Sequence, residues 1–137
     1  MKILLAHNYY GSAAPSGENQ VFETETALLR THGHPVETFT RHSDEIRDQG
    51  VWGTVQGAFA VPWNPWSVVS IRRAVDAFQP DIVHVHNTFP LISPGIFPAI
   101  GHRAARVLTL HNYRLFCPAA IPMRAGHAGT ESLARRS

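Results

Sequence analysis

Two short apolar runs rich in β-branched residues each end in His-Asn, one at His86 and Asn87 and the other at His111 and Asn112. Such runs are typical of strands buried on both faces, as in a parallel sheet covered by helices. Ligands of open α/β sheets bind outside the carboxyl ends of the strands. The two runs are therefore expected to bring both His-Asn pairs to the edge of the sheet where chemistry normally occurs.

Alternating strand and helix patterns occupy most of the remaining chain. Ser16 fits a helix N-cap and Gly33 a helix end. In the helix between them, Val21, Leu28 and the pair Phe22 and Leu29 recur at helical spacing. Asn64 followed by proline favours a second helix start, after which Val68, Ile71, Val75 and Phe78 fall on one face. Strands are predicted at residues 2–6, 36–40, 81–86 and 106–110, and helices at residues 17–30 and 65–79 and from residue 94 onward. This order predicts a Rossmann-like, doubly wound, mostly parallel α/β sheet.

Composition narrows the class of protein. The 137 residues suit a single domain, and 44% hydrophobic with 16% charged residues is a globular composition. No apolar run approaches the ~18 residues that span a membrane, and the apolar start of the chain is too short for a signal peptide. The single Cys117 excludes an internal disulfide. We therefore expect a cytoplasmic protein.

The charge is unevenly placed, with a net charge of −3 over residues 1–100 and +5 over residues 101–137. A basic end of this kind can be a solvated surface. It can also face a phosphate-bearing ligand, or make weak peripheral contact with the inner face of an anionic membrane. Nucleic acid is not expected as a partner, because the arginines are not interleaved with aromatic residues.

Ser16 and Gly17 end a glycine-containing loop that matches neither the dinucleotide-binding nor the phosphate-loop fingerprint. N–H groups at a helix start suit a phosphate or a sugar hydroxyl. The alternative is an ordinary loop with a capping serine.

Three histidines raise the question of a metal. His84, His86 and His111 could together hold zinc in a hydrolase. No carboxylate motif accompanies them, so we expect no metal site and a core position for His84. The other two histidines are expected to act as acid/base or hydrogen-bonding residues in a cleft.

A series of motifs at residues 1–5, 16–21, 63–65, 80–90 and 108–118 resembles the N-terminal half of a glycosyltransferase family 4 enzyme with the GT-B fold. The resemblance covers residues 1 to about 126, and the two His-Asn segments are its specific parts. It implies a retaining transfer of a sugar from a nucleotide-diphosphate sugar to an unidentified acceptor, with no cofactor and no metal in the active site.

In such enzymes the N-terminal domain shapes the acceptor side of a cleft, and a C-terminal domain grips the nucleotide. The resemblance implies that Gly17 lies near the sugar and phosphates and that His111 lines the transferred sugar. We predict His111 as the catalytic residue. The predicted substrate-binding residues are Ser16, Gly17, His86, Asn87, Asn112 and Arg114.

The sequence departs from the family in its length and near its end. Family enzymes run to well over twice this length, and the C-terminal domain with its Glu-x7-Glu signature is absent from these residues. We therefore predict a truncated N-terminal domain at residues 1–126 with an incomplete sheet, and an irregular tail at residues 127–137. Self-association through the open sheet edge and no activity alone are expected. The alternatives are a non-catalytic binding module or split-enzyme subunit and, less favoured, a zinc hydrolase.

Overall fold

The computed structural model describes residues 1–9, 16–42, 63–89, 91–111, 123–124 and 127–128. Four parallel strands form one sheet in the order β2-β1-β3-β4. In chain order the elements are β1 (Ile3–Tyr9), α1 (Gly17–Thr31), β2 (Val36–His42), α4 (Pro65–Phe78), β3 (Ile82–Asn87), α5 (Ile96–Ile100) and β4 (Ala105–Leu108). Two short strands, β5 (Met123–Arg124) and β6 (His127–Ala128), pair antiparallel. The predicted α/β class with a parallel, Rossmann-like sheet is confirmed.

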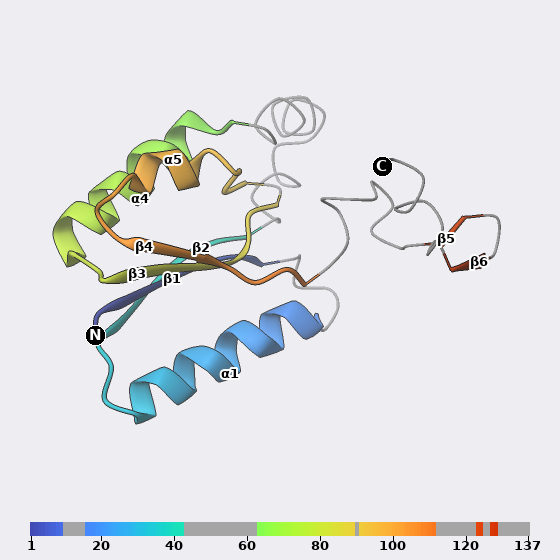
Figure 1. Cartoon of the computed structure of the whole chain (residues 1–137), viewed down its shortest axis with the longest axis horizontal. Helices are drawn as coiled ribbons and strands as arrows, with labels where there is room; N and C mark the ends of the chain where they lie inside the picture. The colour runs from blue at the N-terminus through green and yellow to red at the C-terminus, as the bar shows by residue number, and fades with distance from the viewer. Residues whose placement is uncertain (10–15, 43–62, 90, 112–122, 125–126, 129–137) are drawn as a thin grey trace, which may run out of the picture.

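The helices cover both faces of the sheet, with α1 on one face and α4 and α5 on the other (Figure 1). The chain passes from β1 outward to β2 and then returns to place β3 on the opposite side of β1. The direction of winding therefore changes between β1 and β3. The carboxyl ends of these two strands border the crevice in which doubly wound sheets bind their ligands.

The face covered by α4 and α5 holds the larger apolar core. Successive side chains of a strand point to opposite faces, so alternate residues of β1 and β3, such as Leu4 and Val83, are buried here. α4 contributes Val68, Ile71 and Val75, the residues whose helical spacing predicted an apolar face. This layer fixes β1 and β3 beside each other.

α1 buries only part of the apolar set predicted for it. Val21 and Leu28 are 45% and 55% exposed, so their prediction is wrong, whereas the predicted pair Phe22 and Leu29 packs in the apolar cluster beneath the helix. Phe22 and Thr26 are the buried residues of this helix, and the buried apolar cluster beneath it has only three members among the described residues. The sheet also presents His84 and His86 to this face of α1, where Glu25 meets them.

β1 and β4 differ from their predicted bounds and burial. β1 runs to Tyr9 instead of ending at residue 6, because it is a central strand whose last residues pair with β2. β4 ends at Leu108 and is exposed throughout. The prediction that this run is buried on both faces is wrong, because β4 pairs only with β3 among the described residues. Self-association through this edge stays a prediction.

The helix predicted from residue 94 begins at Ile96 and has five residues. Ser93 has a positive φ of 63°, which places it outside the helix. Pro98 lies within α5 and has no N–H to donate, and a proline in a helix interior favours an early end.

A buried asparagine holds the start of α4. The side-chain oxygen of Asn64 accepts hydrogen bonds from the backbone N–H groups of Trp66 at 3.1 Å and Ser67 at 3.3 Å. Its amide group donates to the Leu91 carbonyl at 2.6 Å. The predicted N-cap is confirmed, and it also joins α4 to the segment that follows β3.

Asn64→Ala should lower the free energy of unfolding by about 1–3 kcal/mol, because it removes a helix cap and a buried hydrogen bond. Asn64→Ser keeps a capping oxygen and should cost less. Urea unfolding followed by circular dichroism measures both variants. Midpoints equal to that of the wild type in both would show that the cap does not stabilise α4.

Candidate functional site

Two His-Asn pairs and a further histidine meet at the carboxyl edge of the sheet. His7 and Asn8 lie near the end of β1, His86 and Asn87 end β3, and His111 follows β4. These strands are neighbours in the order β1-β3-β4. The structure therefore places these residues across the point where the direction of winding changes, which is the usual ligand edge of such sheets.

His86 lies at the centre of four imidazoles. Its buried side chain places Nδ1 at 3.1 Å from Nε2 of His111, in a hydrogen bond whose donor depends on the tautomer. These two rings stack with their centroids 5.3 Å apart. The ring centroid of His84 lies 4.4 Å from that of His86, and the ring centroid of His7 lies 6.3 Å from it. The structure thus brings the two strand-end histidines predicted for the site into direct contact.

Glu25 reaches this group from α1. One carboxylate oxygen lies 2.8 Å from Nδ1 of His84, and the other lies 3.3 Å from Nε2 of His86, outside hydrogen-bond geometry. Nε2 of His84 lies 2.7 Å from Oγ1 of Thr109. His84, predicted as a core residue, is partly buried at 14% exposure, and each of its ring nitrogens has a polar partner.

Burial is the main influence on the protonation of these histidines. Burial, followed by the neighbouring imidazoles of His84, His111 and His7, lowers the pKa of His86 to about 4. Burial also lowers the pKa of His7, and its hydrogen bond to Asn19 opposes that change. The Glu25 carboxylate is bonded to His84 and does not reverse the effect at His86. His86 is therefore a neutral imidazole near pH 7, with one ring nitrogen that donates and one that accepts.

Asn87 ties together β1, α1 and the loop after β3. Its amide group donates to the Asn8 carbonyl and to a Glu18 carboxylate oxygen, both at 3.3 Å. Its side-chain oxygen accepts from the backbone N–H of Phe89 at 3.0 Å. The structure therefore gives this predicted substrate-binding residue a positioning role at the ligand edge.

Ser16 and Gly17 lie at the start of α1, where they were predicted. Ser16 occupies the N-cap position without a side-chain capping bond, and its carbonyl accepts from the Gln20 N–H at 3.1 Å. A Cβ on Gly17 would meet no atom of the described residues within 4 Å. Gly17 lies at a helix start, where N–H groups favour anions and hydroxyl oxygens.

Sequence reasoning and structure overlap only in part at this edge. The predicted residues Asn112 and Arg114 lie outside the described residues. His7 and Asn8 were not predicted, although the first strand also ends in His-Asn and this repetition was a usable signal. Glu25 was not predicted, although it lies three residues after Phe22 and four before Leu29, on the helix face that packs on the sheet.

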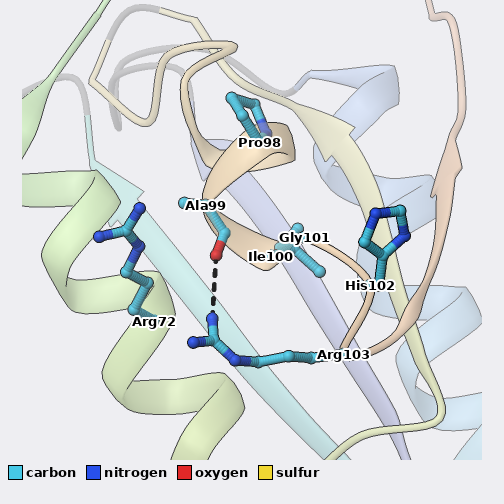
Figure 2. Close-up of a pocket in the computed structure, with 7 residues that line it drawn as sticks. All are labelled: Arg72, Pro98, Ala99, Ile100, Gly101, His102 and Arg103. Carbon is cyan, nitrogen blue, oxygen red and sulfur yellow. Dashed lines mark hydrogen bonds between the residues drawn. The ribbon is translucent and has the colours of Figure 1, made fainter.

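The described residues line open pockets on both faces of the sheet. One, of about 520 Å³, lies between α4 and the connection from α5 to β4, and Arg72, His102 and Arg103 are among its lining residues (Figure 2). Arg103 there donates to the Ala99 carbonyl at 3.3 Å and pairs with Asp76 at 3.4 Å. This connection enters the amino end of β4, so the pocket is at the edge opposite the histidines. The second pocket, of about 550 Å³, is lined by residues of β1, α1 and β2.

Among the described residues, no helix combines the length and the apolar character needed to cross a membrane. Neither a curated protein nor a solved structure gives a significant match to the chain. A family model described as Glycosyltransferase Family 4 matches residues 17–136, which is most of the chain. The matched region contains α1, three of the four parallel strands, and His84, His86 and His111 of the four clustered histidines. The chain belongs to glycosyltransferase family 4.

Proposed function

We propose that this chain is the acceptor-side domain of a retaining glycosyltransferase that uses a nucleotide-diphosphate sugar. The observation that carries the proposal is the hydrogen-bonded pair of His86 and His111 at the ligand edge of a family 4 domain. A donor-binding domain of the same kind of enzyme is the proposed partner, and the transfer takes place in the cleft between the two. A cytoplasmic location, with weak contact to the inner face of a membrane, belongs to the same proposal.

The bond to His86 determines how His111 acts in this proposal. It engages Nε2 of His111, which leaves Nδ1 as the ring atom for a sugar hydroxyl. His86 is buried and neutral, so it orients the His111 ring without adding a charge. In a retaining transfer, positive charge develops at the reacting sugar carbon while the diphosphate leaves. A positioned hydrogen bond that strengthens at this stage lowers the barrier.

The start of α1 completes the proposed site. The helix start at Gly17 suits the close approach of a phosphate or a sugar hydroxyl to its N–H groups. Asn87 holds β1, α1 and the loop after β3 in register, so its contribution to substrate binding is through position. Asn112 and Arg114 remain the predicted substrate contacts that follow His111.

The domain by itself should neither turn over a nucleotide-diphosphate sugar nor bind one with micromolar affinity. In this family the groups that neutralise the leaving diphosphate belong to the C-terminal domain, and such groups supply the main electrostatic stabilisation. Isothermal titration calorimetry with uridine- and guanosine-diphosphate sugars measures the binding. Micromolar affinity would overturn the assignment of this domain to the acceptor side.

Addition of a donor-binding domain of the family, fused or as a separate chain, should permit transfer from a radiolabelled nucleotide sugar to lipid or saccharide acceptors. His102→Ala, at the opposite edge of the sheet, is the matched control and should transfer at the wild-type rate. Binding of an acceptor without any transfer would favour the alternative of a non-catalytic binding module.

A further inference from the structure

Glu25, His84 and His86 bring three ligand atoms to one point between α1 and β3. Nδ1 of His84, Nε2 of His86 and a Glu25 carboxylate oxygen lie within 4.8 Å of one another. The carboxylate oxygens lie 2.8 Å from the first nitrogen and 3.3 Å from the second. Ligands at about 2.0–2.1 Å from a tetrahedral zinc ion are about 3.3 Å apart. Small side-chain rotations would therefore let all three bind the same ion.

Both histidines are oriented through their outer ring nitrogens. Nε2 of His84 is bonded to Oγ1 of Thr109 at 2.7 Å, and Nδ1 of His86 is bonded to His111 at 3.1 Å. Metal-binding histidines almost always bond their second nitrogen to such a partner, which fixes the tautomer and the ring orientation. With an ion bound, the Thr109 hydroxyl would accept from Nε2–H of His84, and the Nδ1 lone pair would face the ion.

The inner nitrogen of His86 makes no hydrogen bond among the described residues, although it is buried. Buried polar atoms without a partner are rare, and each calls for an explanation such as a bound ion or water. The Glu25 and His84 side chains are 29% and 14% exposed, which leaves a route from solvent.

We infer that Glu25, His84 and His86 form a binding site for one divalent transition metal ion, and that zinc best suits this set of two imidazoles and a carboxylate. Three protein ligands leave a fourth tetrahedral position for water. The inference goes beyond the proposed function and does not depend on it, because metal binding requires no nucleotide sugar and no second domain.

Zn²⁺ titrated into the metal-free protein should bind at one ion per chain in isothermal titration calorimetry. Co²⁺ should give the visible absorption of a tetrahedral complex. Glu25→Gln keeps the size of the side chain and removes its charge, so Zn²⁺ affinity should fall by at least about tenfold, and His84→Ala should do the same. Thermal melting without metal shows that each variant is folded.

A third variant and a control variant complete the test. Thr109→Val should weaken Zn²⁺ binding by about 10–100-fold, the usual effect of removing the hydrogen-bond partner of a metal-binding histidine. His102→Ala removes another side chain of a type that binds zinc, at the opposite edge of the sheet, and should leave the affinity unchanged. A lack of saturable one-to-one binding would overturn the inference. So would lost binding in His102→Ala, or wild-type affinity in both Glu25→Gln and His84→Ala.

Discussion

A full-length enzyme that carries His111→Ala in this domain is expected to turn over its sugar donor about tenfold to a thousandfold more slowly than the wild type. His111 lies at the ligand edge with Nε2 bonded to the buried His86, so its ring is oriented before substrate binds. Its loss removes a hydrogen bond that strengthens as charge develops on the sugar. The effect should appear in kcat more than in KM, because the ground state gains less from this bond.

The measurement is kcat per folded enzyme, with the melting temperature recorded beside it. His102→Ala removes an exposed histidine at the opposite edge of the sheet and should leave both values unchanged. His111→Gln retains a hydrogen-bonding side chain and should recover part of the rate. A lowered melting temperature with unchanged kcat in His111→Ala would mean that this histidine is structural.

Acidification from pH 7 to pH 4 should lower the free energy of unfolding of the metal-free domain by about 2–3 kcal/mol. The pKa of His86 is about 4 in the folded protein, against 6.5 for an unperturbed histidine. As the pH falls, the unfolded chain binds a proton near pH 6.5, whereas folded His86 does so only near pH 4. The stabilisation is therefore complete above pH 6.5 and is lost between pH 6.5 and pH 4. The lowered pKa of His7 acts in the same direction.

Urea unfolding at several pH values in the presence of EDTA measures this dependence. His86→Asn removes the titrating group and should flatten the curve over that interval, while His102→Ala should keep its slope. Nuclear magnetic resonance of the imidazole protons follows the His86 pKa directly in the wild-type protein, whatever the stability of the variant. Equal stability at pH 7 and pH 5, or a measured His86 pKa near 6.5, would contradict the expectation.

The fold could be predicted from the sequence wherever a local pattern and the final packing agree. Asn64 with the following proline and the apolar spacing of α4 predicted a helix whose buried face is the one observed. The β-branched run before His86 predicted a buried strand, and β3 lies in the middle of the sheet. β4 has the same type of sequence and is exposed. The burial of a strand depends on whether it has a neighbour on both sides, and the composition of the strand does not carry this information.

Only those residues of the candidate site that lie at the ends of strands could be predicted from the sequence. His86 and His111 were found because the ends of parallel strands meet at one edge. Glu25 could not be found in this way, since its place depends on the rotation of α1 about its axis. Phe22 and Leu29 indicate the observed rotation, but Val21 and Leu28 favour another, and a count of hydrophobic residues does not decide between them. Polar packing between a helix and a sheet is the least visible part of such a fold in sequence.

The hydrogen bond between His86 and His111 has a thermodynamic consequence for the two proposed sites. His86 presents Nδ1 to His111 and Nε2 to the side of Glu25, so the proton positions on one imidazole are shared by both. Any ion that favours one tautomer of His86 changes the donor or acceptor character of His111 toward a sugar. If the bound ion raises the affinity of the domain for a sugar by a given factor, the bound sugar must raise the affinity for the ion by the same factor, because linkage is reciprocal.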